Sequence, residues 1–156
     1  MVYVLGLDVS MNSTGWGVLK KDKNAIHYVD SGVIKVNTKN PHGKRLREQR
    51  EKFHEIVKIY PAKFVAMESG FARHIKSTQV LFKAYGVAEE YFSNKNLVEY
   101  PATTIKKVVT GSGKATKEQV EAVVRKELNL QDYKFLSDDE SDALAVALAL
   151  IKEKQL

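Results

Sequence analysis

The sequence of 156 residues has the length of one domain with a sizeable core, and its 44% hydrophobic and 28% charged residues are ordinary for a folded protein. It contains no cysteine, which excludes disulfides, thiolate metal ligands and a cysteine nucleophile, and which is typical of a reducing cytoplasm. We expect neither a signal peptide nor a membrane partner, while the net charge of +6 favours a polyanionic partner such as nucleic acid.

The first part of the chain predicts three strands in succession. β-Branched and aromatic residues are frequent in these segments, which favours extended structure. The strands are expected at residues 2–9, 14–21 and 25–36. Because the links between them are short, we expect an antiparallel meander.

Helices and two more strands alternate in the rest of the chain. Helical spacing of apolar residues predicts helices at residues 44–60, 77–93, 103–109, 116–128 and 137–154, and short apolar runs predict strands at 63–67 and 96–100. Thr116 with Gln119 and Ser137 with Glu140 each match the capping-box pattern of a helix start. The order predicts one α/β domain, residues 1–156, with a mixed five-stranded sheet flanked by helices on both faces.

Two carboxylates stand at the ends of apolar strands. Asp8 follows the run 2–7, and Glu68 follows the run 63–67. A charge in such a setting is costly unless it is paired, hydrogen-bonded or bound to a metal. If the two strands are neighbours in the sheet, both carboxylates lie at one edge of it.

Two further acids, Asp139 and Asp142, lie three residues apart on the last predicted helix. They therefore share one face, with Cβ atoms roughly 5–6 Å apart. The same face continues through the apolar residues Ala143, Val146, Ala149 and Leu150. We interpret Asp138 and Glu140 differently, as acids that only favour the helix N-terminus electrostatically.

Four clustered carboxylates are hard oxygen ligands of the kind that Mg²⁺ prefers, with Mn²⁺ as an alternative. Four like charges repel one another unless cations lie between them. Two such ions, roughly 3.5–4 Å apart, can activate water and stabilise the leaving oxygen in phosphodiester hydrolysis. The residues therefore predict a two-metal site at Asp8, Glu68, Asp139 and Asp142, and a basic surface suits its substrate.

Four stretches of the sequence resemble the RuvC-type Holliday junction resolvases of the RNase H-like superfamily: LGLDVSMNSTGWGV, FVAMESGFA, IKKVVTGSGKATKEQV and DDESDALAVALAL. They occur in family order and spacing over nearly the whole chain. The resemblance implies an RNase H-like fold and a symmetric homodimer, paired through the helix at 77–93, that cuts four-way DNA junctions. It implies that the four acids bind two divalent ions, that Lys117 serves catalysis, and that Phe71 and Lys106 contact DNA.

Basic residues near these motifs complete the predicted DNA-binding set. Arg73 and Lys76 follow Phe71, and Lys114 ends the loop 111–114. Val9 and Ser10 stand where the cellular family usually has Pro and Gly, and together with the short chain this suggests a phage or viral branch. The departure leaves open a broader specificity for branched DNA and the existence of a motor-protein partner.

Two alternatives stay open from the sequence. Actin-like sugar kinases and ATPases also begin with an Asp, small residues and Gly, but they need two related domains and 156 residues offer one. The other alternative is a non-catalytic branched-DNA-binding module on the same fold. The presence of all four acids argues against it.

Overall fold

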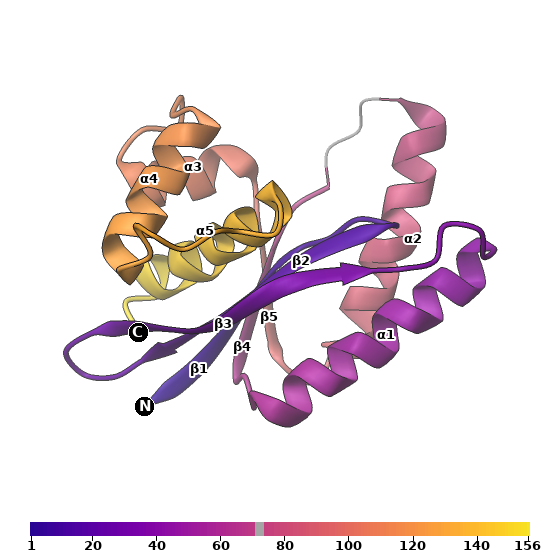
Figure 1. The fold of residues 1–156 in the computed structure, drawn as a ribbon, viewed down its shortest axis with the longest axis horizontal. Helices are drawn as coiled ribbons and strands as arrows, with labels where there is room; N and C mark the ends of the chain where they lie inside the picture. Colours follow the sequence, from indigo (N-terminus) through magenta and orange to yellow (C-terminus); the bar gives the residue numbers. More distant parts are fainter. Residues whose placement is uncertain (71–73) are drawn as a thin grey trace.

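The computed structural model describes residues 1–70 and 74–156, which form five strands and five helices (Figure 1). The strands are β1 (Val2–Asp8), β2 (Ser13–Lys21), β3 (Ile26–Lys35), β4 (Phe64–Glu68) and β5 (Asn96–Tyr100). The helices are α1 (His42–Ile59), α2 (Ile75–Tyr91), α3 (Ala102–Thr110), α4 (Lys117–Leu128) and α5 (Asp138–Glu153). The predicted α/β class and order of elements are confirmed.

The five strands form one mixed sheet in the order β3-β2-β1-β4-β5. β1, β2 and β3 pair antiparallel, as the short links between them predict. β4 pairs parallel with both β1 and β5, because the chain crosses over through α1 before β4 and through α2 before β5. The central strand β1 is therefore antiparallel to one neighbour and parallel to the other.

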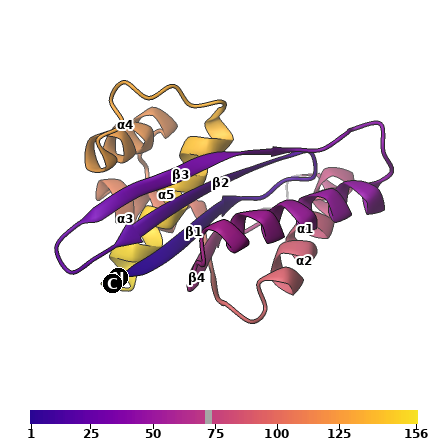
Figure 2. The same cartoon turned by 60° about the horizontal axis from the view of Figure 1, so that its bottom comes forward.

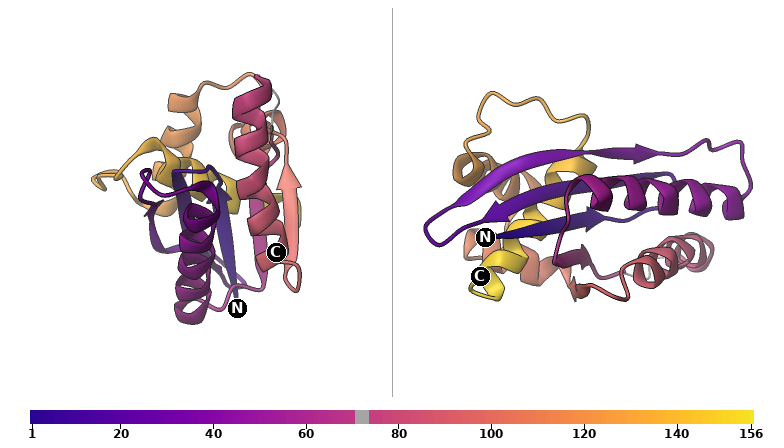
Figure 3. Two further views of the ribbon diagram at one scale, coloured as in Figure 1. Left: turned by 90° about the vertical axis from the view of Figure 1, so that its right-hand side faces the viewer. Right: turned by 90° about the horizontal axis from the view of Figure 1, so that it is seen from below.

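The helices cover the two faces of the sheet in separate groups. α1 and α2 lie on one face, and α3, α4 and α5 lie on the other (Figure 2). Seen from below, α1 and α2 lie to the right, and α3, α4 and α5, coloured orange to yellow, lie to the left (Figure 3, right-hand view). Each face has its own apolar core, because successive residues of a strand point to opposite sides: Leu5 and Leu7 of β1 pack toward α1 and α2, whereas Val4 packs toward α5.

Glycines let α5 lie directly on the sheet. A Cβ atom on Gly6 of β1 would stand 2.1 Å from the carbonyl oxygen of Ala143, and one on Gly15 of β2 would stand 1.8 Å from that of Asp139. From Ala143 to Ile151 every residue of α5 is buried between the sheet and the helices α3 and α4. In the described part of the chain, no helix has both the length and the apolar character that crossing a membrane requires.

The two predicted capping boxes have different outcomes. At the start of α4, Thr116 Oγ1 accepts from the backbone N–H of Gln119, and the Gln119 side chain accepts from the backbone N–H of Thr116, as predicted. At the start of α5, Ser137 makes no side-chain cap bond, so this predicted box is wrong. Its intended partner Glu140 is fully buried instead and bonds elsewhere.

Candidate active site

Asp8 and Glu68 lie at the carboxyl ends of neighbouring parallel strands. Leu7 of β1 is in register with Met67 of β4, so the two acids are the next residues along both strands. Alternation along the strands places both acids on the face that carries α5, because Leu7 and Met67 belong to the opposite core. The adjacency that the sequence left conditional is confirmed.

The N-terminal end of α5 brings Asp139 and Asp142 over the same edge of the sheet. Gly15 is the register partner of Asp8 on β2, and its Cα lies directly beneath the backbone of Asp139. The glycine thus allows the start of α5 to approach the strand that carries Asp8. Acids separated by more than 130 positions in the chain meet here because the sheet and the helix are in direct contact.

The four carboxylates affect one another electrostatically. Burial, followed by the charges of Asp142, Asp139 and Glu68, raises the pKa of Asp8 from 3.8 to about 8. Burial and the charge of Asp142 also raise the pKa of Glu68 above its ordinary value. Burial likewise raises the pKa of Asp142, although Lys117 opposes that change. Without a bound cation, the group therefore resists full ionisation.

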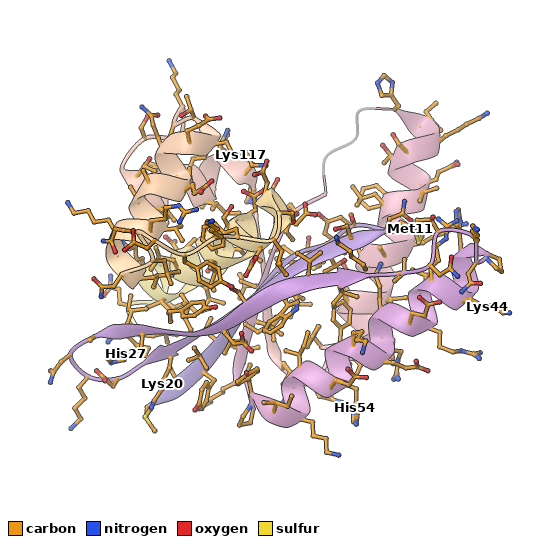
Figure 4. All side chains as sticks on the ribbon, in the orientation of Figure 1. Met11, Lys20, His27, Lys44, His54 and Lys117 are labelled. Atoms are coloured by element: carbon orange, nitrogen blue, oxygen red, sulfur yellow. The ribbon has the colours of Figure 1, made fainter. Side chains whose placement is uncertain are left out.

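Lys117 supplies a cation of the protein itself at this site. Its Nζ lies 3.0 Å from Asp142 Oδ2 and 3.4 Å from Asp138 Oδ2. Figure 4 labels Lys117 at the start of α4. Burial alone would lower the pKa of Lys117, but its bonds to Asp142 and Asp138 raise it above the ordinary value. The first-turn acid Asp138, which we interpreted only as a helix-terminal charge, thus also pairs with the candidate catalytic lysine.

The chemistry of the four acids fits divalent cations, although their side chains do not yet enclose one. Carboxylate oxygens are the ligands that Mg²⁺ and Mn²⁺ take, and added positive charge would relieve the repulsion that raises the pKa of Asp8. Among residues 1–70 and 74–156, no three His, Cys, Asp or Glu side chains already surround one point where an ion could lie. In this arrangement Asp142 Oδ2 is paired with Lys117 Nζ at 3.0 Å.

Two cavities open at the acids. The larger, of about 650 Å³, is lined by Asp8 and Glu68 on the sheet and by Lys76 and Tyr85 of α2. Burial, followed by the charges of Glu68 and Asp8, raises the pKa of the Tyr85 phenol. A predicted DNA-binding lysine and a tyrosine that the sequence did not indicate therefore share the wall opposite the acids.

The smaller cavity, of about 250 Å³, lies between α3, α4 and α5 and contains Glu68, Asp142, Lys106 and Lys117 in its lining. The charges of Lys106 and Lys117 lower the pKa of Glu68 against the larger effect of burial. Both predicted lysines are thus beside the acids. Lys114 is exposed and lines neither cavity, while the predicted DNA contacts Phe71 and Arg73 lie outside the described residues.

Glu140 is not a surface acid at the helix N-terminus, so our interpretation of it from the sequence is wrong. Its side chain is fully buried, and its Oε1 accepts hydrogen bonds from the hydroxyls of Ser31 at 2.6 Å and Tyr133 at 2.9 Å. Its Oε2 accepts from the backbone N–H of Leu136 at 2.6 Å. These bonds tie the start of α5 to β3 and to the loop that precedes the helix.

Two more polar residues that sequence reasoning missed support the site from behind. Gln49 of α1 is buried and bonds the turn between β1 and β2, and Ser13, the first residue of β2, bonds Asp139. A signal for Gln49 exists: it lies three residues after Leu46 and four before Phe53, on the apolar stripe of its helix. A polar residue on such a stripe needs a buried hydrogen-bond partner. For Ser13 the sequence carries no comparable signal.

The mixed five-stranded sheet, its strand order and the acids at its edge define an RNase H-like domain of the nuclease type. A solved structure described as T. thermophilus RuvC in complex with Holliday junction substrate matches 99% of this chain and 96% of that chain with a TM-score of 0.89, at 24% identity. The family model for the crossover junction endodeoxyribonuclease RuvC matches residues 4–150. The chain belongs to this family.

Curated relatives of the same family match this chain over nearly its full length. The crossover junction endodeoxyribonuclease RuvC of Orientia tsutsugamushi (strain Boryong) is 34% identical over 98% of this chain and 97% of its own. That of Ehrlichia canis (strain Jake) is 38% identical over 93% of each chain. These relatives are bacterial, so they do not support the phage or viral branch suggested by the altered first motif. The fowlpox virus resolvase shares the fold, with a TM-score of 0.64 at 14% identity.

Proposed function

We propose that this protein is a structure-selective DNA endonuclease that resolves Holliday junctions, and other branched DNA, by divalent-metal-dependent phosphodiester hydrolysis. The observation that carries the proposal is the convergence of Asp8, Glu68, Asp139 and Asp142, from three separate elements, on one sheet edge of a RuvC-family chain. Relatives with this name are nucleases. We place the activity in the bacterial cytoplasm, where such DNA forms.

We assign two Mg²⁺ ions per active site to the four acids, with Mn²⁺ as a substitute. When bound, such ions supply an activated water and stabilise the charge on the leaving oxygen. The protein contributes the carboxylates that hold the ions and the walls that position the scissile strand. Lys117 lies beside Asp142 and in the smaller cavity with Glu68, where it stabilises negative charge on the reacting phosphate.

Lysines around the acids are assigned to the DNA backbone. Lys76 lines the larger cavity and Lys106 lines the smaller one, so both reach the edge where the strand must pass. Phosphate contacts of this kind position DNA without reading its sequence. Phe71, Arg73 and Lys114 complete the proposed DNA-binding set by their places in the motifs and loops of the chain.

We further assign α2 to the interface of a symmetric homodimer. Ile75 is 80% exposed and Phe82 is 49% exposed, so this helix carries large apolar side chains that the single chain leaves uncovered. Two copies joined along this helix would present two active sites to the two strands of a four-way junction. Light scattering should give a dimer for the wild type and a monomer for Phe82→Glu. Ile59→Glu, at an exposed apolar position of α1, should stay dimeric.

A cleavage assay tests the proposed function. With Mg²⁺ or Mn²⁺, we expect the wild type to cut four-way junctions well, three-way junctions and flaps less well, and linear duplex hardly at all. Glu68→Gln and Asp142→Asn should lose cleavage but still bind junctions. Glu118→Gln, a change at an exposed acid in the first turn of α4, is the matched control and should cut normally.

Three outcomes would overturn the proposal in different ways. Equal cutting of linear duplex would contradict structure selectivity. Cleavage by Glu68→Gln at the wild-type rate would contradict the assignment of the site. If the wild type binds junctions and cuts none of the substrates with either metal, the chain is a non-catalytic branched-DNA-binding module instead.

A further inference from the structure

Ser13, the first residue of β2, contacts one of the proposed metal ligands directly. Its Oγ donates a hydrogen bond of 2.8 Å to Asp139 Oδ2. Ser137 approaches the same oxygen only at 3.5 Å, which is too long for a strong bond. Ser13 lies two residues before Gly15, and residues two apart on a strand point to the same face. The close approach at Gly15 therefore also brings the Ser13 hydroxyl to Asp139.

The backbone of Ser13 is fixed by its own turn. The Ser10 hydroxyl donates to the Ser13 carbonyl oxygen at 2.7 Å and accepts from the Ser13 backbone N–H at 3.1 Å. The Ser10 backbone N–H in turn donates to Thr14 Oγ1 at 3.1 Å. These three bonds close the turn on itself just before β2 begins, so the Ser13 hydroxyl starts from a fixed position.

Gln49 holds this turn, in which Figure 4 labels Met11, against α1. Its Nε2 donates to the carbonyl oxygens of Ser10 at 2.7 Å and Met11 at 2.8 Å, and its Oε1 accepts from Thr14 Oγ1 at 3.0 Å. Gln49 is 1% exposed and Thr14 is fully buried. Bonds of this kind are costly to break because each would leave a buried polar atom without a partner.

We propose that Ser13 is a positioning residue for Asp139, which it orients for metal binding, and that Gln49 keeps Ser13 in place. This inference rests on the proposed function, in which Asp139 is a metal ligand. A carboxylate whose Oδ2 accepts a hydrogen bond from a fixed hydroxyl has less freedom to rotate. Partners behind metal ligands commonly change metal affinity or activity by about 10–100-fold when they are removed.

The test compares Ser13→Ala with Ser13→Thr, which keeps a hydroxyl at the same place. Calorimetric titration of Mn²⁺ into the metal-free protein should show about tenfold weaker binding for Ser13→Ala and near-normal binding for Ser13→Thr. In junction cleavage, Ser13→Ala should need about tenfold more Mg²⁺ for half-maximal rate, while its rate at saturating Mg²⁺ stays close to that of the wild type. Ser93→Ala, at an exposed serine after α2, is the matched control.

A merely structural role predicts a different pattern. It would lower the thermal stability of Ser13→Ala in EDTA and leave the Mg²⁺ requirement of the folded fraction unchanged, and that result would overturn the proposal. Equal Mn²⁺ affinity of Ser13→Ala and the wild type would overturn it as well. If the Ala variant does not fold, Ser13→Cys, which keeps the size but donates more weakly, must bind Mn²⁺ less tightly than the wild type for the proposal to stand.

Failure of the inference can be told apart from failure of the proposed function. If the wild type binds Mn²⁺ and cuts junctions while Ser13→Ala behaves identically, only the role of Ser13 is refuted. If the wild type itself takes up no Mn²⁺, the assignment of Asp139 as a metal ligand is refuted, and the inference with it.

Discussion

Lys117 Nζ lies 3.0 Å from Asp142 Oδ2. The ammonium group of Lys117 is therefore paired with a carboxylate that we propose as a metal ligand. The pair joins the first turn of α4 to the second turn of α5. If Asp142 holds a divalent ion as we propose, the ion and Lys117 would compete for this carboxylate, and a released Lys117 would be free to face the DNA backbone.

Lys117→Met should separate metal binding from cleavage. Removing the competing cation should strengthen Mn²⁺ binding about two- to fivefold, since a half-exposed ion pair contributes at most about 1 kcal/mol. Cleavage should nevertheless fall, because the positive charge beside Glu68 and Asp142 is lost. Lys126→Met removes an equal charge at an exposed position in the last turn of α4, outside both cavities, and should change neither quantity. Weaker Mn²⁺ binding by Lys117→Met would contradict the competition.

Without divalent ions, the protein should lose stability as the pH rises from about 4 to about 8. The pKa of Asp8 is about 8 in the folded protein and 3.8 ordinarily, so between these values the folded state keeps a proton that the unfolded chain has released. The favourable contribution is complete below the lower pKa and disappears as the pH rises to the higher one.

Urea unfolding in EDTA at pH 5, 6, 7 and 8 measures this effect. The free energy of unfolding should fall with pH for the wild type and fall less steeply for Asp8→Asn. The slope should shrink without vanishing, because burial also raises the pKa of Glu68 and of Asp142. Identical slopes for the two proteins would show that Asp8 is not the group responsible.

Glu140→Gln should destabilise the protein although no charge partner is lost. The glutamine side chain has one NH₂ group in place of a carboxylate oxygen. This NH₂ would face either the Leu136 N–H or the hydroxyls of Ser31 and Tyr133, which now donate to the carboxylate. We expect a loss of about 1–3 kcal/mol in the free energy of unfolding, the usual effect of one unsatisfied buried group. Glu118→Gln on the surface of α4 should change it little, and an equal effect of the two substitutions would refute this role of Glu140.

Gly15→Ala should disturb both stability and cleavage. The added Cβ would meet the Asp139 carbonyl oxygen, which is backbone and cannot rotate away, so α5 must shift. Overpacking of this kind costs about 1–3 kcal/mol. Gly43→Ala, in an open position of the first turn of α1, should instead not destabilise the protein and should leave cleavage intact. Normal cleavage by Gly15→Ala would mean that the contact does not position the acids.

The sequence predicts the strands, helices and four acids because their signals are local. Alternation and helical spacing identify the elements, and the isolated charges of Asp8 and Glu68 stand out against apolar runs. The four acids could be proposed as site residues from the sequence alone. A carboxylate in an apolar setting needs a hydrogen bond, an ion pair or a metal ion to offset the cost of burying its charge.

Contacts between residues far apart in the chain cannot be predicted from local sequence patterns. Glu140 has the position of a helix-terminal acid, and only the folded chain brings Ser31, 109 residues away, to its carboxylate. Ser13 has the same limitation, because its hydroxyl finds Asp139 only through the close approach of α5 to the sheet. A serine in a turn and a glutamate in a first helical turn are ordinary in sequence, so their roles here appear only when the elements are packed.

A crystal structure with Mn²⁺, read from its anomalous difference density, tests the central claim most directly. We predict two peaks among Asp8, Glu68, Asp139 and Asp142, with the Asp142 carboxylate released from Lys117. Density at other positions alone, or none while Asp142 stays paired with Lys117, would contradict the claim that these acids form a metal centre.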